Sequence, residues 1–228
     1  DLRLGRWQDV LADMGEVDAL ICDPPYSART HAGHDEAGDA AGALLGFTSW
    51  RSDDVSEFVS HWAARTRGWF VAMTSHDLLP AWESELAGSG RYVFAPLPWF
   101  APGSRVRIAG DGPSNWTCWI IVARPKTREH QHWGTLPGGY AGPSDRDFVG
   151  GKPLWLMRAL VRDYSRPGDL VCDPCAGAAT TLLAARLEGR RSVGAEMDPN
   201  TYAIAKRRIA ADLRDTADGA QLALGGGR

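Results

Sequence analysis

The sequence has no run of eighteen apolar residues, and its first residues lack the apolar core of a signal peptide. We therefore expect neither a membrane-spanning helix nor export, and we predict a cytoplasmic protein. Cysteine is also scarce: the four cysteines lie mostly inside apolar, strand-like runs, where a reduced thiol behaves as a small buried hydrophobe, so no disulfide framework is expected. The formal net charge is only −3, so contact with a polyanion must depend on a local basic patch.

Hydrophobic residues make up 44% of the 228 residues, which is enough for one substantial core. Apolar runs bounded by turn residues predict strands over residues 17–22, 69–73, 92–99, 116–123, 169–172 and 192–196. Segments of helical period separate these runs, including residues 154–164 and a helix that begins at Asp198 and Pro199. The alternation predicts an α/β fold with a doubly wound, mostly parallel sheet.

Two stretches, residues 27–50 and 124–151, do not follow this alternation and are predicted to be long surface loops. Loops of this length are uncommon inside a compact domain and are more often functional than structural filler. We expect one domain over residues 1–216 and a tail over residues 217–228, with a frayed glycine-rich end.

A turn of small residues follows the apolar run before Asp173 and leads into a helix at Thr180. A ligand lying across the end of a parallel strand must approach the backbone closely, which small residues allow. Glu196 follows Asp173 by 23 positions, at the end of the next strand, where a carboxylate can accept both hydroxyls of a ribose. The segment predicts a nucleoside site, and the alternative is a purely structural turn.

The same turn lacks the Gly-x-Gly-x-x-Gly pattern of a phosphate-binding loop, which disfavours a nicotinamide dehydrogenase. Cys172 and Cys175 form a Cys-x-x-Cys pair, which is found at redox and zinc sites. No second cysteine pair exists and the histidines lack zinc-type spacing, so no metal is expected.

The second informative segment is Asp23-Pro24-Pro25-Tyr26, directly after the strand over residues 17–22. The two prolines fix φ and remove two amide donors, which leaves nearby carbonyl groups as acceptors beside the Asp23 carboxylate. An exocyclic amino group has two protons that need hydrogen-bond acceptors, and the Asp23 carboxylate and the Pro24 carbonyl can supply both acceptors. Tyr26 offers a flat face for stacking of an extruded base. The alternative is a structural Pro-Pro turn.

The pair of motifs, Asp-Pro-Pro-Tyr early and Asp-Pro-Cys-Ala-Gly-Ala-Ala-Thr-Thr late, resembles the amino-methyltransferases of DNA. The order, with the catalytic motif before the cofactor motif, is similar to that of their beta group, which methylates adenine N6 or cytosine N4. The resemblance implies a Rossmann-like fold, S-adenosylmethionine as the cofactor and DNA as the substrate. The catalytic residues that it implies are Asp23, Pro24, Pro25 and Tyr26.

The resemblance also implies a cofactor site that draws on most of the chain. Asp9 matches an acidic residue at the cofactor's adenine ring, Lys152 and Pro153 line its methionine moiety, and Glu196 binds its ribose. An acidic residue at the turn, Asp173, suits the positive charge of the cofactor. The full implied set is Asp9, Cys22, Asp23, Lys152, Pro153, Asp173, Pro174, Cys175, Ala176, Gly177, Ala178, Thr180, Thr181, Glu196 and Met197.

Three departures from the family pattern fall in this site. Cys175 replaces an aromatic residue, and Ala179 replaces the second glycine of the turn. If φ is positive at that position, Ala179 costs about 1 kcal/mol, which would weaken cofactor affinity. Residues 149–151, Val-Gly-Gly, replace a His-Pro-Thr-Gln type run before Lys152.

The resemblance implies direct transfer: the amino nitrogen, held by Asp23 and Pro24, attacks the methyl group in line with the sulfonium. Alignment and acceptors for the growing positive charge are what the protein supplies. The target base must first be flipped out of the duplex. The Asp-first motif favours adenine N6, since cytosine N4 enzymes more often begin with serine.

Contacts to the DNA backbone are predicted from a basic region. Its members are Arg105, Arg107, Arg124, Lys126 and Arg128. An ordinary solvated loop is an equally weighted alternative. In the beta group, the region between the last sheet strands and the Lys-Pro segment commonly carries target recognition, which suggests residues 124–149. So short a recognition segment implies a short target site or a second subunit in a homodimer.

Other functions remain open at this stage. Cytosine N4 methylation, RNA adenine methylation and protein glutamine methylation are alternative amino substrates, although the last family typically has asparagine in place of Asp23. A non-catalytic nucleic-acid-binding homologue, with cofactor binding lost through Ala179, is the alternative from a different class. The sequence indicates neither a recognition sequence nor a restriction endonuclease partner.

Overall fold

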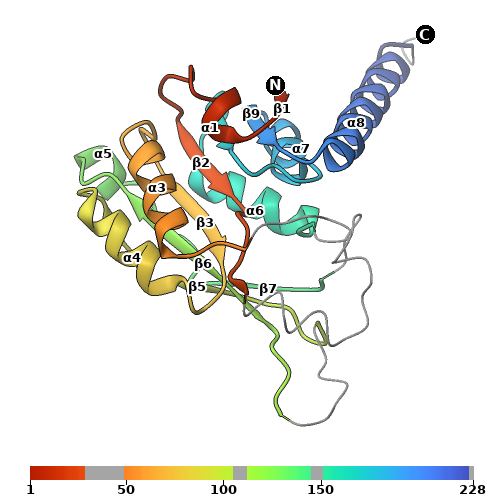
Figure 1. The fold of residues 1–228 in the computed structure, drawn as a ribbon. Helices are drawn as coiled ribbons and strands as arrows, with labels where there is room; N and C mark the ends of the chain where they lie inside the picture. Colours follow the sequence, from red (N-terminus) through yellow and green to blue (C-terminus); the bar gives the residue numbers. More distant parts are fainter. Residues whose placement is uncertain (29–48, 105–111, 145–150, 226–228) are drawn as a thin grey trace.

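The computed structural model describes residues 1–28, 49–104, 112–144 and 151–225, with side chains described as far as residue 212. These residues form a sheet in the order β1-β9-β8-β2-β3-β6-β5-β7, with β4 paired to β6 (Figure 1). The strands are β1 Leu2–Leu4, β2 Ala19–Cys22, β3 Phe70–Thr74, β4 Tyr92–Val93, β5 Leu97–Phe100, β6 Thr117–Arg124, β7 Tyr140–Ala141, β8 Leu170–Asp173 and β9 Arg191–Glu196.

The five strands from β1 to β3 run parallel, as the alternating pattern predicts. Strand β6 is antiparallel to β3 and begins where β3 ends, since Trp119 pairs with Thr74 and Ala123 with Phe70. The carboxyl ends of β1, β9, β8, β2 and β3 therefore meet at one edge of the sheet, which we call the carboxyl edge. In open α/β sheets this edge is where ligands bind.

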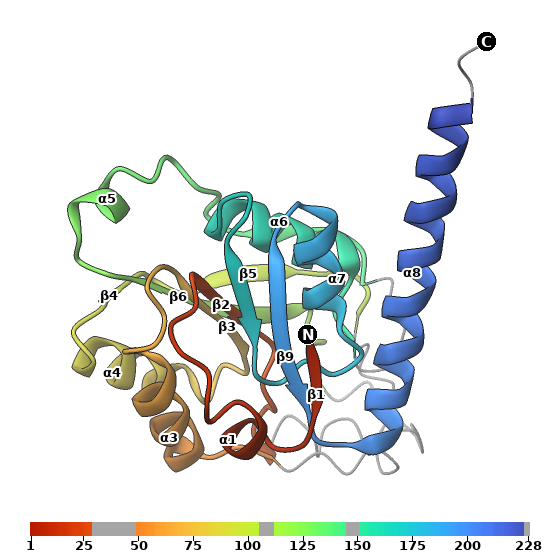
Figure 2. The same cartoon turned by 90° about the horizontal axis from the view of Figure 1, so that it is seen from above.

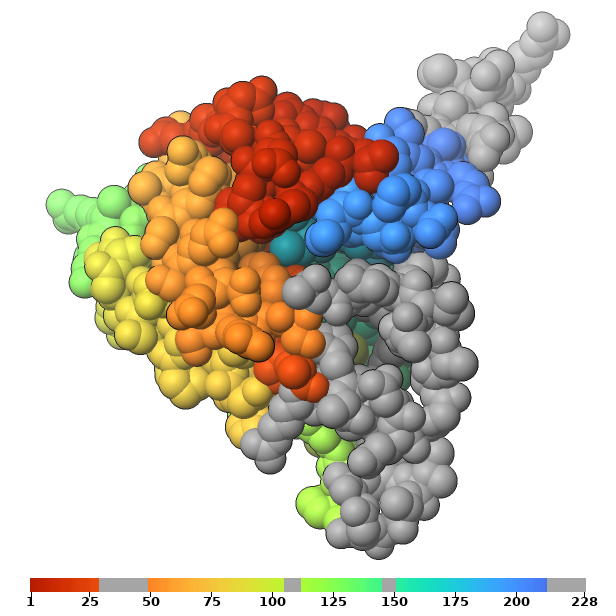
Figure 3. All heavy atoms as spheres, in the orientation of Figure 1, coloured from red at the N-terminus to blue at the C-terminus, as the bar shows by residue number. Residues whose placement is uncertain are grey.

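Helices cover both faces of the sheet (Figures 1 and 2). One face carries α6 Leu154–Tyr164 and α7 Thr180–Leu187, and the other carries α1 Trp7–Val10, α3 Ser52–Trp62 and α4 Leu79–Gly88. Helix α8 Pro199–Gly225 follows β9 and packs its first turns against α7 and β1, and α5 Arg128–Gln131 follows β6. The first and last described segments lie side by side on the surface (Figure 3) because β1 pairs with β9.

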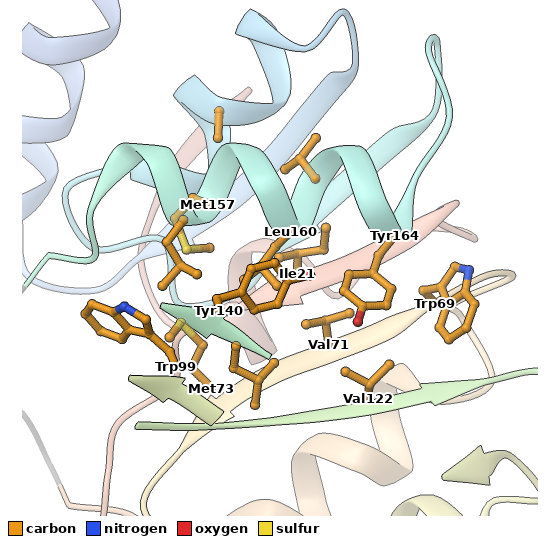
Figure 4. Close-up of a cluster of buried hydrophobic side chains, with 14 of the residues drawn as sticks. Ile21, Trp69, Val71, Met73, Trp99, Val122, Tyr140, Met157, Leu160 and Tyr164 are labelled. Atoms are coloured by element: carbon orange, nitrogen blue, oxygen red, sulfur yellow. The ribbon is translucent and has the colours of Figure 1, made fainter. Parts of the chain in front are cut away.

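Successive side chains of a strand point to opposite faces of the sheet, and each face has its own hydrophobic core. Ile21 points to the face under α6, whereas Leu20 and Cys22 point to the face under α3 and α4, and all three are fully buried. Under α6, the aromatic ring of Tyr164 packs near Trp69 at one end of the core (Figure 4). The predicted apolar face of residues 154–164 is thus confirmed.

Several predicted boundaries are wrong. The expected strand over residues 92–99 is two strands, β4 and β5, because the three residues between them, Phe94 to Pro96, face only two residues of β6 and interrupt the pairing. Residues 124–151 are not one loop, since they contain α5 and β7. The expected tail from residue 217 is helical, because α8 continues to Gly225; residues 226–228 lie outside the described part, as does most of the predicted loop 27–50.

Strand β1 is an element that the sequence pattern did not predict, because three residues are too short to show a period. In the described part of the chain, no helix combines the length and the apolar content needed to cross a membrane.

Candidate functional site

Three carboxylates follow one another along the carboxyl edge. Asp23 comes directly after β2, Asp173 ends β8 and Glu196 ends β9, and these strands are neighbours in the sheet. Two of the three are nearly inaccessible, with exposed fractions of 2% for Asp173 and 5% for Glu196. Buried acids at a strand-end crevice are candidates for ligand binding or catalysis.

The turn after β8 has an unusual backbone. Gly177 has φ 52°, and Ala179 has φ 64° and ψ 29°, which makes Ala179 the only non-glycine residue of the described part with a positive φ. The condition stated for Ala179 is therefore met, and an alanine occupies a left-handed position. A Cβ atom added at Gly177 would meet no atom within 4 Å, so the backbone there borders open space.

Asp173 anchors this turn. Its Oδ1 accepts a hydrogen bond of 3.1 Å from the Cys175 amide, and the Thr181 hydroxyl donates a second. Burial outweighs these bonds and raises the pKa of Asp173 to about 7, and the nearby Asp23 and Glu196 carboxylates add to the rise. A cation bound at this turn would favour the ionised form of Asp173 and lower its pKa.

The other predicted turn residues occupy mixed positions. Pro174, Ala176 and Ala178 are buried, whereas Cys175 is half-buried. The Thr180 hydroxyl lies 3.1 Å from a guanidinium nitrogen of Arg208, which also binds the Ala178 carbonyl. Thr180 therefore holds the start of α7 against α8 in this structure.

Glu196 lies in a setting that fits a nucleoside. Its Oε1 accepts a 2.8 Å bond from the Asp198 amide, and burial raises its pKa. Leu4 and Met197, at the ends of the paired strands β1 and β9, are 46% and 57% exposed and offer apolar surface for a flat ring. Asp9 is exposed on α1, which follows β1 at the same edge.

Asp23 is held by two side chains. The Tyr26 hydroxyl donates to Asp23 Oδ1 at 2.9 Å, and the Lys152 ammonium lies 2.5 Å from Oδ2. Lys152 comes from the segment before α6, 129 positions away along the chain, and Pro153 beside it is the N-cap of that helix. The predicted Lys152 and Asp23 are thus brought into direct contact.

Tyr26 has different contacts from those expected of a stacking residue. Its ring is only 8% exposed, and the Lys152 ammonium lies 4.8 Å from the ring centroid. Its hydroxyl lies 2.9 Å from the sulfur of Cys118, a residue that the sequence analysis did not select. The open flat face that was expected is therefore absent in this arrangement.

Cys22 is a second correction. Its side chain is fully buried in the core under α3 and α4, with its thiol directed at the Val71 carbonyl, so only its backbone lies at the edge. Burial also raises the thiol pKa values of Cys22, Cys172 and Cys175, and no disulfide joins any of the four cysteines, all of which lie in the described residues.

A small hollow that is partly open to solvent lies beside Tyr26. It is lined by Tyr26, residues 74–76, Asn115 and residues 117–119. Ser75, His76 and Asn115 bring polar groups to it and were not predicted. The available signal was the polar run Thr74-Ser75-His76 directly after a buried strand, the same position that Asp23 occupies after β2.

Most of the predicted basic region lies at the opposite edge from Asp23. Arg124 ends β6, and seven steps of roughly 3.3 Å put it about 23 Å from Thr117, which lines the hollow. Lys126 and Arg128 follow Arg124, so these three residues lie far from the catalytic motif, and their contact with the DNA backbone stays a prediction. Arg105 and Arg107 lie outside the described residues.

The chain returns to the carboxyl edge only at β7. Tyr140 and Ala141 pair with Trp99 and Phe100 of β5. Of the predicted recognition segment 124–149, residues 140–141 therefore lie at this edge and the first half does not, whereas residues 145–149 lie outside the described part. Phe100 and Trp116, both exposed, form an edge-to-face pair at 6.0 Å near this point.

Comparison with known proteins identifies the architecture. The fold matches the structure of the M1.HpyAVI–SAM complex with a TM-score of 0.69 at 19% identity, covering 91% of this chain and 98% of that one. It also matches PvuII DNA methyltransferase, described as cytosine-N4-specific, with a TM-score of 0.66 at 16% identity, covering 90% and 84%. The sheet has the Rossmann-like fold of these methyltransferases.

Sequence similarity narrows this class to a family. Residues 108–207 match the family described as DNA methylase. YubD of Escherichia coli (strain K12), which is named a methylase, is 30% identical over 207 residues, covering 90% of this chain and 86% of YubD. The chain belongs to the N6/N4 DNA amino-methyltransferase family.

Proposed function

We propose that this protein transfers a methyl group from S-adenosylmethionine to the exocyclic amino group of a flipped DNA base, with adenine N6 as the preferred target. The observation that carries the proposal is the position of Asp23. Its carboxylate is hydrogen-bonded to Tyr26, which lines the hollow, and its charge contributes to the raised pKa of Asp173 in the nucleoside-type site. Asp23 thus links a cofactor site to the wall of a hollow that we assign to a second ligand.

The cofactor is S-adenosylmethionine, and the residues present fit it. Glu196 is placed to accept the ribose hydroxyls, while Leu4 and Met197 offer apolar surface to the adenine ring. Asp173 supplies negative charge for a cationic ligand, and Lys152 supplies positive charge for a carboxylate. When bound, the cofactor supplies a methyl group on a positively charged sulfur, ready for transfer to a nucleophile.

The chain's own contribution to the reaction is to hold the amino nitrogen and accept its protons. A carboxylate has about four lone-pair positions, of which Tyr26 and Lys152 occupy two on Asp23. Asp23 can therefore accept a hydrogen bond from one amino proton while the Pro24 carbonyl accepts a hydrogen bond from the other. Both acceptors stabilise positive charge that grows on the nitrogen as the new bond forms, and Asp23 or water then takes the proton.

The choice of base rests on the first residue of the motif. Asp23 matches the pattern more often found with adenine, which favours N6. The structural match to PvuII methyltransferase, whose name specifies cytosine N4, supports the second candidate. Both reactions use the same acceptors, so the choice between them leaves the mechanism unchanged.

Nucleoside mass spectrometry of DNA from a methylation-free host that expresses this chain tests the proposal. A host expressing Asp23→Ala at the same level is the matched control. New N6-methyl-2′-deoxyadenosine that is absent from the control supports the proposal. N4-methyl-2′-deoxycytidine would keep the mechanism and change the base. Unmodified DNA, with the protein folded and the cofactor bound, would contradict the proposal.

A further inference from the structure

Cys118 lies beside the catalytic motif without belonging to it. The residue is the second of β6, and its side chain is 5% exposed. Its sulfur lies 2.9 Å from the Tyr26 hydroxyl, across 92 positions of sequence, and 3.8 Å from the Thr74 carbonyl. The thiol therefore connects the end of β3, the start of β6 and the turn after β2.

The direction of these hydrogen bonds follows from counting protons. The Tyr26 hydroxyl has one proton, and its contact with Asp23 Oδ1 at 2.9 Å uses it, because a carboxylate paired with the Lys152 ammonium is an acceptor only. The phenol oxygen can then only accept from Cys118. The single thiol proton has three acceptors in reach: the Tyr26 oxygen at 2.9 Å and the carbonyl oxygens of Trp119 and Thr74 at 3.7 and 3.8 Å. Donation to the nearest of them, the phenol oxygen, continues into the phenol's donation to the carboxylate.

We propose that Cys118 is a positioning residue for methyl transfer, acting through Tyr26 on the carboxylate of Asp23. The inference rests on the proposed function and adds a residue to it. Tyr26 fixes Oδ1 while Lys152 holds Oδ2, so the carboxylate plane has one orientation. A hydrogen bond that Tyr26 accepts strengthens the one that it donates, since hydrogen bonds in a chain polarise one another.

The hollow lies next to the side chains that orient the Asp23 carboxylate. Tyr26 and Cys118 both line the hollow, and the same side chains that border the second ligand also orient the acceptor oxygen. A carboxylate free to rotate would present its lone pairs to the amino group only part of the time. Loss of the thiol is therefore expected to lower kcat for methyl transfer without weakening cofactor binding.

The test compares Tyr26→Phe, Cys118→Ala and the double variant in the full chain, with DNA as substrate. Tyr26→Phe is expected to lower kcat about tenfold to a hundredfold, the range for loss of a hydrogen bond to a charged group. Cys118→Ala is expected to lower kcat by a smaller factor, and the double variant no further than Tyr26→Phe alone. Cys118→Ser, which keeps a donor, is expected to restore most of the rate.

Two measurements separate positioning from a structural role. The Kd for cofactor, measured by calorimetry, is expected to stay at the wild-type value in Cys118→Ala, and the KM for DNA to change less than kcat. Cys172→Ala removes a different fully buried thiol and is the matched control, with unchanged kcat per folded molecule expected.

The outcomes distinguish the two proposals. Transfer by the wild type, with a lowered kcat in Cys118→Ala that Cys118→Ser restores, supports the positioning role. Transfer by the wild type with an unchanged kcat in Cys118→Ala, or with fully multiplicative effects in the double variant, overturns it alone. No transfer by the wild type, with cofactor bound, overturns the proposed function and this inference with it.

Discussion

Asp173 makes the stability of the cofactor-free protein depend on pH. Its pKa is raised from 3.8 to about 7, chiefly by burial. The difference is roughly three pH units, and at 1.36 kcal/mol for each unit it corresponds to roughly 4 kcal/mol between the protonated and ionised forms. Because the pKa of Asp173 is higher in the folded than in the unfolded protein, the protonated carboxyl group contributes this free energy to folding. The contribution is fully present below about pH 4 and is lost as the pH rises to about 7.

The substitution Asp173→Asn removes the charge and keeps the shape. An amide oxygen can still accept from the Cys175 amide, so the turn keeps that hydrogen bond. We expect the variant and the wild type to have similar free energies of unfolding at pH 4. At pH 8 the variant is expected to be more stable by roughly 2 to 4 kcal/mol, since only the wild type buries a charge.

Urea denaturation at pH 4, 6 and 8, followed by tryptophan fluorescence, measures this difference. Asp53→Asn, a substitution of an exposed acid in α3, is the control and is expected to follow the wild type. The difference between wild type and Asp173→Asn isolates this carboxylate from other groups with shifted pKa values. A difference that stays constant from pH 4 to pH 8 would refute the reasoning.

Three further results follow from the geometry. Ala179→Gly is expected to leave the free energy of unfolding within about 1 kcal/mol of wild type. Glycine relieves the strain of the left-handed alanine, about 1–2 kcal/mol, but the variant loses a buried methyl group and has a more flexible unfolded chain. A free energy of unfolding about 3 kcal/mol below wild type, measured by urea denaturation, would contradict this expectation. Gly194→Ala places a Cβ 2.8 Å from the Asp173 carbonyl oxygen. Thermal denaturation should therefore show a lower Tm, and calorimetry should show weaker binding of the cofactor. An unchanged Tm together with an unchanged cofactor Kd would count against this close packing. Replacing Lys126 and Arg128 by glutamine should leave the salt dependence of DNA binding by anisotropy unchanged, because both lie at the opposite edge; a shallower slope would show that DNA reaches them.

Local signals in the sequence were enough for the cofactor turn. Small residues after an apolar run predicted the strand, turn and helix around Asp173, and the glycine position of the family turn showed where a positive φ at Ala179 would matter. These features depend on neighbours within a few residues. The helical period of residues 154–164 likewise predicted the buried face of α6.

Features that depend on the direction of a strand were not predicted. A period of two is the same whether a strand runs parallel or antiparallel, so nothing local showed that β6 carries Arg124 away from the site. The contacts of Tyr26 are also long-range: Cys118 and Lys152 meet it only because β6 pairs with β3, the neighbour of β2, and α6 packs over β2. A motif can thus identify a catalytic residue without indicating which side chains orient it.

Incubation of the purified protein with duplex DNA and S-adenosylmethionine that carries a deuterated methyl group tests the proposed methyl transfer. After digestion to nucleosides, the deuterated methyl group is expected on the exocyclic nitrogen of a base with wild type. No label is expected with Asp23→Ala, although calorimetry should show cofactor bound to both proteins. Label transferred by Asp23→Ala at the wild-type rate would rule out the role of Asp23 in the transfer.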